Sequence, residues 1–262
     1  MTRTLLILLA ILLFLPNLFN TSFFHEEKYN NREEFSPSLS YINSLDKLDQ
    51  HIDSITTSLK INKDSARYRY VYQISKIIRE RFYHGYSHFT FTENWIASLA
   101  GKFIEEGLGT KVQPDKILSQ DNAACSQQAI VMMAALRNKG IPNRHLGFAH
   151  HYTLEAFIDN KWYFFDPNME PTMNQAQRCE DSWKYHSDSL KKYYDASKTK
   201  AINFDFGYGL SPDKGTINEE PALNARIFQT STAILSKTLW CFPLLLIFMR
   251  KKAYFPFNKK AV

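Results

Sequence analysis

The sequence lacks several features that would place it in a well-marked protein class. It has only three cysteines in 262 residues, no internal repeat, no low-complexity tract and no calcium-binding loop of alternating acids. Because Cys241 lies in an apolar C-terminal run, only Cys125 and Cys179 are left for a disulfide. The chain is 44% hydrophobic and 15% aromatic, which is enough for one domain with a substantial core.

A basic surface is also lacking, although the formal net charge is +6. Seven of the positive charges lie close to the two termini with no acid among them: Arg3, Lys237, Arg250, Lys251, Lys252, Lys259 and Lys260. The rest of the chain therefore carries a net charge of about −1. This distribution argues against a nucleic-acid partner and relates the charge to membrane topology instead.

The N-terminal segment, residues 1–24, contains an uninterrupted apolar run from Leu5 to Leu15. Such a run is typical of a signal peptide or a short signal anchor. A signal-peptide cleavage site would need small residues after the apolar run, but the sequence reaches Phe23 and Phe24 there. This favours an uncleaved anchor.

The C-terminal run from Ala233 to Met249 is apolar apart from residues 236–238, and Arg250 to Lys252 follow it. This pattern predicts a transmembrane helix over 231–250 and a basic cytoplasmic tail over 251–262. A buried or amphipathic C-terminal helix is the alternative. With both termini inside, the main domain is predicted to lie outside the cytoplasm at the inner or plasma membrane.

Between these ends, apolar residues at helical spacing predict three helices. A stripe from Leu45 to Leu59 indicates that residues 25–64 are a helical stalk or a segment docked on the core. Further patterns predict helices over Tyr70–Phe82 and Trp95–Glu106. Residues 171–230 form a C-terminal extension with a helix near Ser182–Tyr194, either a rim of the site or a connection to the membrane segment.

The region 65–170, predicted to be the core of the domain, contains the clearest signals for where helices and strands begin and end. A helix over Ser126–Lys139 follows Cys125 and ends at Gly140. Two extended runs, His151–Ile158 and Lys161–Phe165, are separated by only two residues, which predicts a β-hairpin.

This arrangement predicts a nucleophile, a base and an orienting acid. A thiol at a helix N-terminus faces free N–H groups that stabilise a thiolate. In the hairpin register, His151 and Asp166 are diagonal neighbours on one face, and we expect the Cys125 helix to pack on that face. His150 points to the other face. Each residue alone also has a structural interpretation, a buried thiol, a hydrogen-bonded histidine or a turn-capping aspartate.

The same residues resemble the transglutaminase-like superfamily, in particular its bacterial membrane-anchored members. The resemblance covers about residues 120–170 and rests on Cys125 opening a helix, on the Gly140-Ile141-Pro142 turn, on the strand that begins at His151 and on Asp166-Pro167. It implies an α+β fold with a papain-like, transglutaminase-like core over residues 65–170, in which the cysteine helix packs on an antiparallel sheet. It also implies a Cys125-His151-Asp166 triad that cleaves or transfers an amide or peptide acyl group through a thioester, without a cofactor.

The sequence departs from the family pattern at Ala123, where a glycine is usual, and at Tyr152, where a small residue is usual. The first departure bears on the oxyanion hole, for which the Cys125 N–H is the expected donor and Asn122 a tentative second one. The implied partners are a protein, peptide or amide-bearing envelope substrate and the membrane. An envelope binding module without catalysis is the alternative function.

Four other polar residues near the predicted triad have weaker claims to a role: His145, His150, Glu155 and Cys179. His145, His150 and His151 are close in sequence, but neighbouring strand histidines point to opposite faces, so we expect no metal site. Glu155 shares the triad face and is expected to be a partly exposed strand residue, with a supporting role behind the triad as the alternative. No role is predicted for Cys179.

Overall fold

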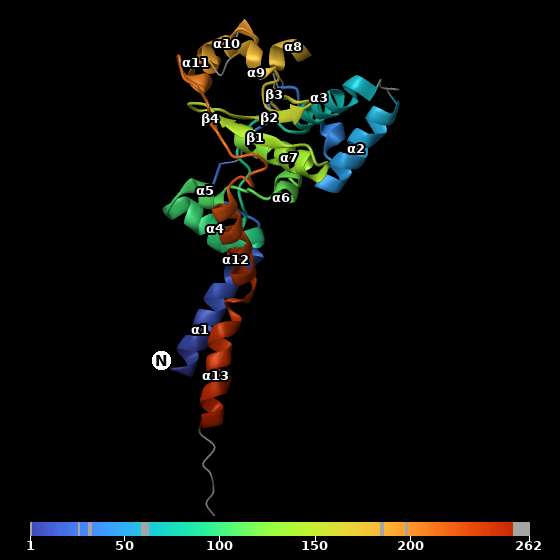
Figure 1. Cartoon of the computed structure of the whole chain (residues 1–262). Helices are drawn as coiled ribbons and strands as arrows, with labels where there is room; N and C mark the ends of the chain where they lie inside the picture. The colour runs from blue at the N-terminus through green and yellow to red at the C-terminus, as the bar shows by residue number, and fades with distance from the viewer. Residues whose placement is uncertain are drawn as a thin grey trace, which may run out of the picture. The chain divides into compact units, whose positions relative to one another are not determined.

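The computed structural model describes residues 2–25, 27–30, 33–58, 63–183, 186–196 and 199–253. Within these residues the chain is an α+β protein with thirteen α-helices and one four-stranded antiparallel sheet (Figure 1). It divides into two compact units. The core unit comprises residues 26–87 and 112–222, and the terminal unit comprises residues 1–25, 88–111 and 223–262.

The sheet belongs to the core unit and has the strand order β3-β2-β1-β4. Its strands are β1 (Asn143–Gly147), β2 (Tyr152–Ile158), β3 (Lys161–Phe165) and β4 (Asp213–Lys214). Between β2 and β3, Asp159 and Asn160 have positive φ angles of 48° and 63°, as a type I′ turn requires. Ile158 pairs with Lys161 across this turn, so the predicted hairpin and its register are confirmed.

Helix α7 (Cys125–Asn138) begins and ends within one residue of the predicted helix. Its side chains from Gln127 to Leu136 are buried. The helix ends because Gly140 takes a φ of 63°, which lets the Ile141 N–H donate to the Leu136 carbonyl at 2.9 Å. Helix α7 packs against β1 and β2.

Helices α3 (Lys63–Arg81) and α7 cover one face of the sheet. Tyr68 of α3 packs against Tyr163 and Phe165 of β3, and Asn143 of β1 donates to the Met133 carbonyl of α7. These sheet residues share a face, because each strand alternates and their pairing is in register.

Four short helices cover the opposite face, so the sheet lies between two helical layers (Figure 1). They are α8 (Gln175–Arg178), α9 (Glu180–Trp183), α10 (Ser187–Lys191) and α11 (Thr199–Phe206). These helices and the loops beside them contribute apolar side chains to a cluster with two sheet residues: Leu146, Phe164, Met173, Trp183, Leu190, Tyr194, Ile202 and Phe206. The prediction that the Cys125 helix packs on the face of Phe164 and Glu155 is therefore wrong. Where the sequence predicts one helix near Ser182–Tyr194, the structure has two short helices, α9 and α10.

Helix α2 (Leu45–Ser58) also belongs to the core unit and follows a 3-10 turn, η2 (Pro37–Leu39). It packs against α3, α6 (Pro114–Leu118) and α7, with Leu48 and Ile52 fully buried. The helix is thus docked on the core rather than extended as a stalk. Leu59, at the end of the predicted stripe, lies outside the described residues.

The terminal unit gathers α1 (Arg3–Phe14), η1 (Leu15–Leu18), α4 (Phe91–Phe103), α5 (Glu106–Gly109), α12 (Leu223–Thr238) and α13 (Cys241–Ala253). Asn94 of α4 departs from helical geometry, and its amide donates to the Gln229 carbonyl at 3.0 Å and to Thr232 at 2.9 Å. These contacts explain why residues 88–111 group with the termini, whereas the sequence placed them in a core of residues 65–170.

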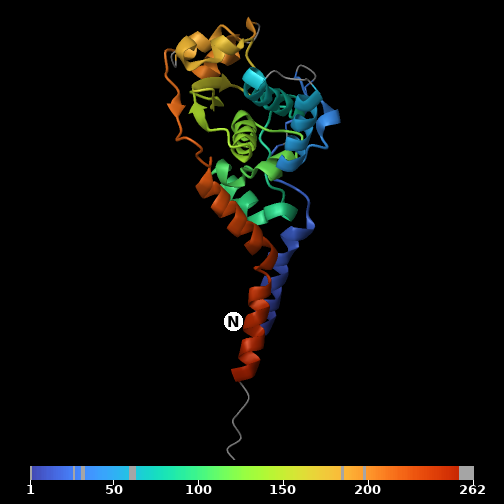
Figure 2. The ribbon, with the colours of Figure 1, turned by 45° about the vertical axis from the view of Figure 1, so that its right-hand side comes forward.

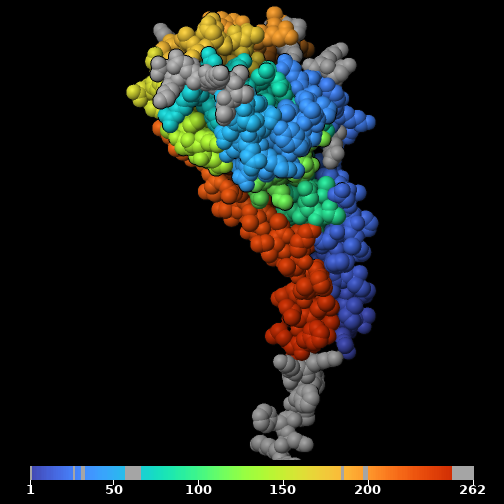
Figure 3. Space-filling view, turned by 90° about the vertical axis from the view of Figure 1, so that its right-hand side faces the viewer, coloured from blue at the N-terminus to red at the C-terminus, as the bar shows by residue number. Residues whose placement is uncertain are grey.

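Helices α1 and α13 lie side by side within the terminal unit (Figures 2 and 3). Phe14 and Trp240 meet edge to face, with ring centroids 5.4 Å apart. In the described ranges, no helix by itself has both the length and the apolar character needed to cross a bilayer. The stretches Leu223–Thr238 and Cys241–Met249 meet that condition only as a pair, bent by 55°. Two helices therefore occupy the region predicted as one span over 231–250.

Candidate active site

The candidate site forms where α7 begins, where β2 begins and where β3 has just ended. Cys125 is the first residue of α7, His151 precedes Tyr152 of β2, and Asp166 follows Phe165 of β3. Asp166 is fully buried and His151 is 4% exposed, whereas Cys125 is half-buried. The three predicted residues are thus brought together at one end of the sheet.

His151 Nε2 and Asp166 Oδ2 are 2.7 Å apart, the length of a charge-assisted hydrogen bond. The carboxylate can only accept, so Nε2 donates. Cys125 acts on the same ring, because its hydrogen bonding and charge help to raise the pKa of His151, and Nδ1 is the ring nitrogen that faces no carboxylate. The predicted proximity of His151 and Asp166 is confirmed, and the imidazole lies between the sulfur and the carboxylate.

Asp166 accepts four hydrogen bonds. Oδ1 accepts from the backbone N–H groups of Asn168 and Met169, each at 3.0 Å. Oδ2 accepts from the Tyr194 hydroxyl at 2.8 Å as well as from His151. Four donors hold the carboxylate in one orientation and compensate for its removal from water.

The charge state of the pair follows from these contacts. Burial by itself lowers the pKa of His151, but the charge and hydrogen bond of Asp166, with a contribution from Cys125, raise it to about 10. Burial by itself raises the pKa of Asp166, yet His151, the Met169 N–H and Tyr194 bring it below its ordinary value. An imidazolium and a carboxylate therefore face each other at neutral pH.

The start of α7 is held by Gln127, which is 1% exposed. Its side-chain oxygen accepts from the N–H groups of Ala124 at 3.2 Å and Ser87 at 2.9 Å. Its amide nitrogen donates to the carbonyl and the hydroxyl of Ser87. A buried amide with several partners positions the first turn, and with it Cys125, more firmly than a surface cap would.

Ala123 does not disturb the entry into α7. Its N–H donates to the Tyr83 carbonyl at 3.1 Å, and it is not among the described residues with positive φ. Alanine is therefore compatible with the backbone where the family has glycine. The N–H groups of the first helical turn, including that of Cys125, have no intrahelical acceptor and are the donors available for an oxyanion.

Asn122 takes a different position from the one its tentative assignment requires. Its amide nitrogen donates to the carbonyls of Gly85 at 3.4 Å and Tyr86 at 3.0 Å. Because both amide hydrogens have these acceptors, Asn122 stabilises the Gly85–Tyr86 segment and does not line the cleft.

His150 lines the same cleft as Cys125 and His151, so the prediction that it points to the opposite face is not confirmed. Its ring stacks on Phe204 of α11, with centroids 4.1 Å apart and planes 7° apart, and its N–H donates to the Asp205 carbonyl. In the described part of the chain, no group of three or more histidines, cysteines or acids is arranged to hold a metal ion.

Glu155 differs from its prediction as a partly exposed residue, because it is fully buried. It lies opposite Phe164 on the face covered by α8–α11. Its Oε2 accepts from Arg144 at 2.8 Å and 2.9 Å, and the guanidinium stacks over Trp162. Burial raises the pKa of Glu155 to about 7, although Arg144 opposes the shift.

The cysteines are not joined to each other. Cys125, Cys179 and Cys241 are all free thiols, so the disulfide considered for the first two is absent from these described residues. Cys179 is buried and bridges Tyr163 of β3 through the backbone.

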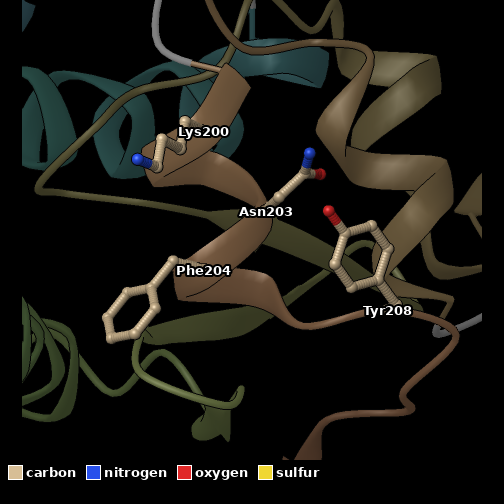
Figure 4. A pocket seen from close by; sticks show the side chains of 4 residues that line it. All are labelled: Lys200, Asn203, Phe204 and Tyr208. Atoms are coloured by element: carbon tan, nitrogen blue, oxygen red, sulfur yellow. The ribbon is translucent and has the colours of Figure 1, made fainter.

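A cleft of about 740 Å³ opens onto the thiol. Cys125 and His151 line it from one side, and Tyr193, Tyr194 and Phe204 line it from the helical layer. Phe204 also borders a shallower groove of about 530 Å³ (Figure 4). The other residues that line this groove are Lys200, Asn203 and Tyr208. The extension after residue 170 thus contributes one wall of the cleft.

Comparison with known protein families, with curated proteins and with solved structures gives no match for this chain. The functional assignment therefore depends on the geometry of the site and on the resemblance of the short sequence patterns.

Proposed function

We propose that this chain is a transglutaminase-like cysteine enzyme with a papain-like core, in which Cys125, His151 and Asp166 carry out acyl transfer. One observation carries the proposal: a half-buried thiol at the start of α7 lines the same cleft as an imidazole whose Nε2 is 2.7 Å from a buried carboxylate. Nucleophile, base and orienting acid are therefore connected in series beside an open cleft.

The reaction would proceed in two halves. The proton of the Cys125–His151 pair resides on His151, and the Cys125 thiolate attacks the carbonyl carbon of an amide. The tetrahedral oxyanion is stabilised by the Cys125 N–H. His151 then gives its proton to the leaving amine as the C–N bond breaks, which leaves a thioester on Cys125. Water or an amine attacks the thioester, His151 accepts the proton of that nucleophile, and the thiolate is released.

The favoured substrate is a peptide or another amide-bearing molecule of the cell envelope, with water as the acceptor. The apolar helices α1 and α13 pair in the terminal unit, which supports an anchor that places both termini on the same side of a membrane. The catalytic unit would then act outside the cytoplasm. Nucleic acid is not a proposed partner, because the basic residues concentrate at the termini.

The test is the rate of Cys125 alkylation by iodoacetamide as a function of pH, measured on the full chain in detergent and mapped by mass spectrometry. An ordinary thiol reacts slowly below its ionisation near pH 8.5. We expect rapid labelling at pH 6 in the parent, slowed at least about 10-fold in His151→Ala. His51→Ala, a histidine of α2 remote from the triad, is the matched control and should label like the parent.

Other outcomes point elsewhere. If the parent and His151→Ala both show ordinary thiol behaviour, the catalytic proposal fails and the alternative, an envelope binding module that keeps the fold, replaces it. Labelling that requires prior reduction would indicate a disulfide and would contradict both the free thiols and the proposal.

A further inference from the structure

A fourth side chain reaches the candidate triad from the extension that the sequence left without a role. Tyr194 follows α10, is 8% exposed, and donates its hydroxyl to Asp166 Oδ2 at 2.8 Å. The acceptor is the same oxygen that His151 Nε2 contacts at 2.7 Å. Two donors from different elements therefore share one carboxylate oxygen.

Tyr194 is held in this position by contacts that do not involve the triad acid. Its ring lies 5.1 Å from the ring of Phe206, which also contacts His151 at 5.2 Å. The adjacent Tyr193 carbonyl accepts from both the N–H and the hydroxyl of Thr172, at 2.8 Å and 2.7 Å. The hydroxyl is thus preorganised to meet Asp166.

The electrostatic effect of the hydroxyl has a definite sign. Burial, together with Asp166, raises the pKa of Tyr194 well above its ordinary value, so the hydroxyl keeps its proton and acts as a donor. Its positive hydrogen reduces the negative potential at Oδ2. The imidazolium of His151 therefore experiences less than the full charge of the carboxylate.

We propose that Tyr194 is a positioning residue that fixes Asp166 and moderates the basicity of His151 by sharing Oδ2. The catalytic meaning of this role rests on the proposed function. An imidazole that binds its proton less firmly returns it more readily to the leaving amine. The α8–α11 layer would thereby belong to the catalytic machinery and not only to the cleft wall.

Other ionisable groups also act on this pair and must stay unchanged in a test. Cys125 of α7 lines the same cleft as His151 and helps to raise its pKa. Burial raises the pKa of Asp205 of α11. The charges of His151, His84, Asp166 and His150 act on the same carboxyl group. None of these groups changes when the Tyr194 hydroxyl alone is removed.

The experiment measures the titration of His151 by NMR of full-length protein in detergent, with histidine labelled by ¹⁵N and Cys125→Ala as the background. His151→Gln identifies the resonance. In Tyr194→Phe, we expect the midpoint of His151 to rise by about one pH unit. Tyr163→Phe is the matched control, because Tyr163 is also 8% exposed but faces α3 on the other side of the sheet.

A graded variant keeps the test decisive if Tyr194→Phe does not fold. Difluorotyrosine at position 194 is a stronger donor of similar shape, and it should lower the midpoint of His151. A midpoint that does not move in either variant, or that moves equally in Tyr163→Phe, overturns the proposal. Because the background lacks the thiol, this outcome is separate from failure of Cys125 alkylation, which tests the proposed function.

Discussion

Two carboxylates on the same side of the sheet, Asp166 and Glu155, are both fully buried yet differ in their electrostatics. At the end of β3, Asp166 accepts four hydrogen bonds, and its pKa is lowered. In the middle of β2, Glu155 has Arg144 on one oxygen, and its Oε1 has no hydrogen-bond partner among the described residues. Its pKa rises to about 7. The number of donors, rather than burial, decides which group carries a charge.

The largest expected effect is that of Asp166→Ala. The substitution leaves His151, Tyr194 and two backbone N–H groups in a buried site without their acceptor. Removing one partner of a buried ion pair typically costs about 3–5 kcal/mol, so we expect a loss of this size in the free energy of unfolding at pH 6. Urea denaturation of the full chain in detergent measures it.

The pH dependence of this loss provides a control. The raised pKa of His151 stabilises the fold fully below about pH 6.5, and this contribution disappears as the pH rises toward about 10. The lowered pKa of Asp166 adds stability above about pH 3.9, which is lost on acidification. The difference in unfolding free energy between the parent and Asp166→Ala should therefore be greatest between about pH 3.9 and about pH 6.5. A difference that stays constant to pH 10 would contradict an ion pair.

A smaller effect is expected for Glu155→Gln. Its pH dependence is opposite to the contribution of Asp166, because the pKa of Glu155 is raised and that of Asp166 is lowered. Since burial raises the pKa of Glu155 to about 7, the parent is favoured below about pH 4.5 and loses that advantage as the pH passes 7. We expect the unfolding free energy of the parent, relative to the variant, to fall by about 3 kcal/mol between pH 4 and 8. Equal pH profiles would mean that Arg144 keeps Glu155 ionised throughout.

The smallest effect is expected for Asn168→Ala. Asn168 supports Asp166 through its backbone N–H, which alanine retains, while its amide contacts His84 at the surface. We expect the unfolding free energy to change by no more than about 0.5 kcal/mol. The measurement is thermal unfolding of Asn168→Ala, compared with that of Asp166→Ala and of the parent. A loss comparable to that of Asp166→Ala would show that the side chain, not the backbone, supports the acid.

The residues that the sequence placed correctly are linked by local patterns. The turn at Asp159 and Asn160 follows from residue types that tolerate positive φ, and it sets the register that aligns His151 with Asp166. The helix after Cys125 follows from apolar spacing and Gly140. The four-stranded antiparallel sheet and the α+β class agree with these expectations.

The features that were missed depend on contacts between distant segments. Tyr194 lies 28 residues beyond Asp166, and Gln127 is held by Ser87, 40 residues before it. Asn94 contacts Gln229 across 135 residues, and this tertiary contact overrides the expected membership of residues 88–111 in the core. The polarity of Glu155 alone predicts exposure, whereas four helices from later in the chain cover it and bury it.

The two-residue turn between β2 and β3 also bears on how the site is assembled in time. His151 and Asp166 are only 15 residues apart and belong to one hairpin, so their meeting requires the closure of one short loop. Hairpins form within about 1–10 μs, before most long-range packing. On this basis we expect His151 and Asp166 to meet within one hairpin, before α7 packs and brings Cys125 beside them.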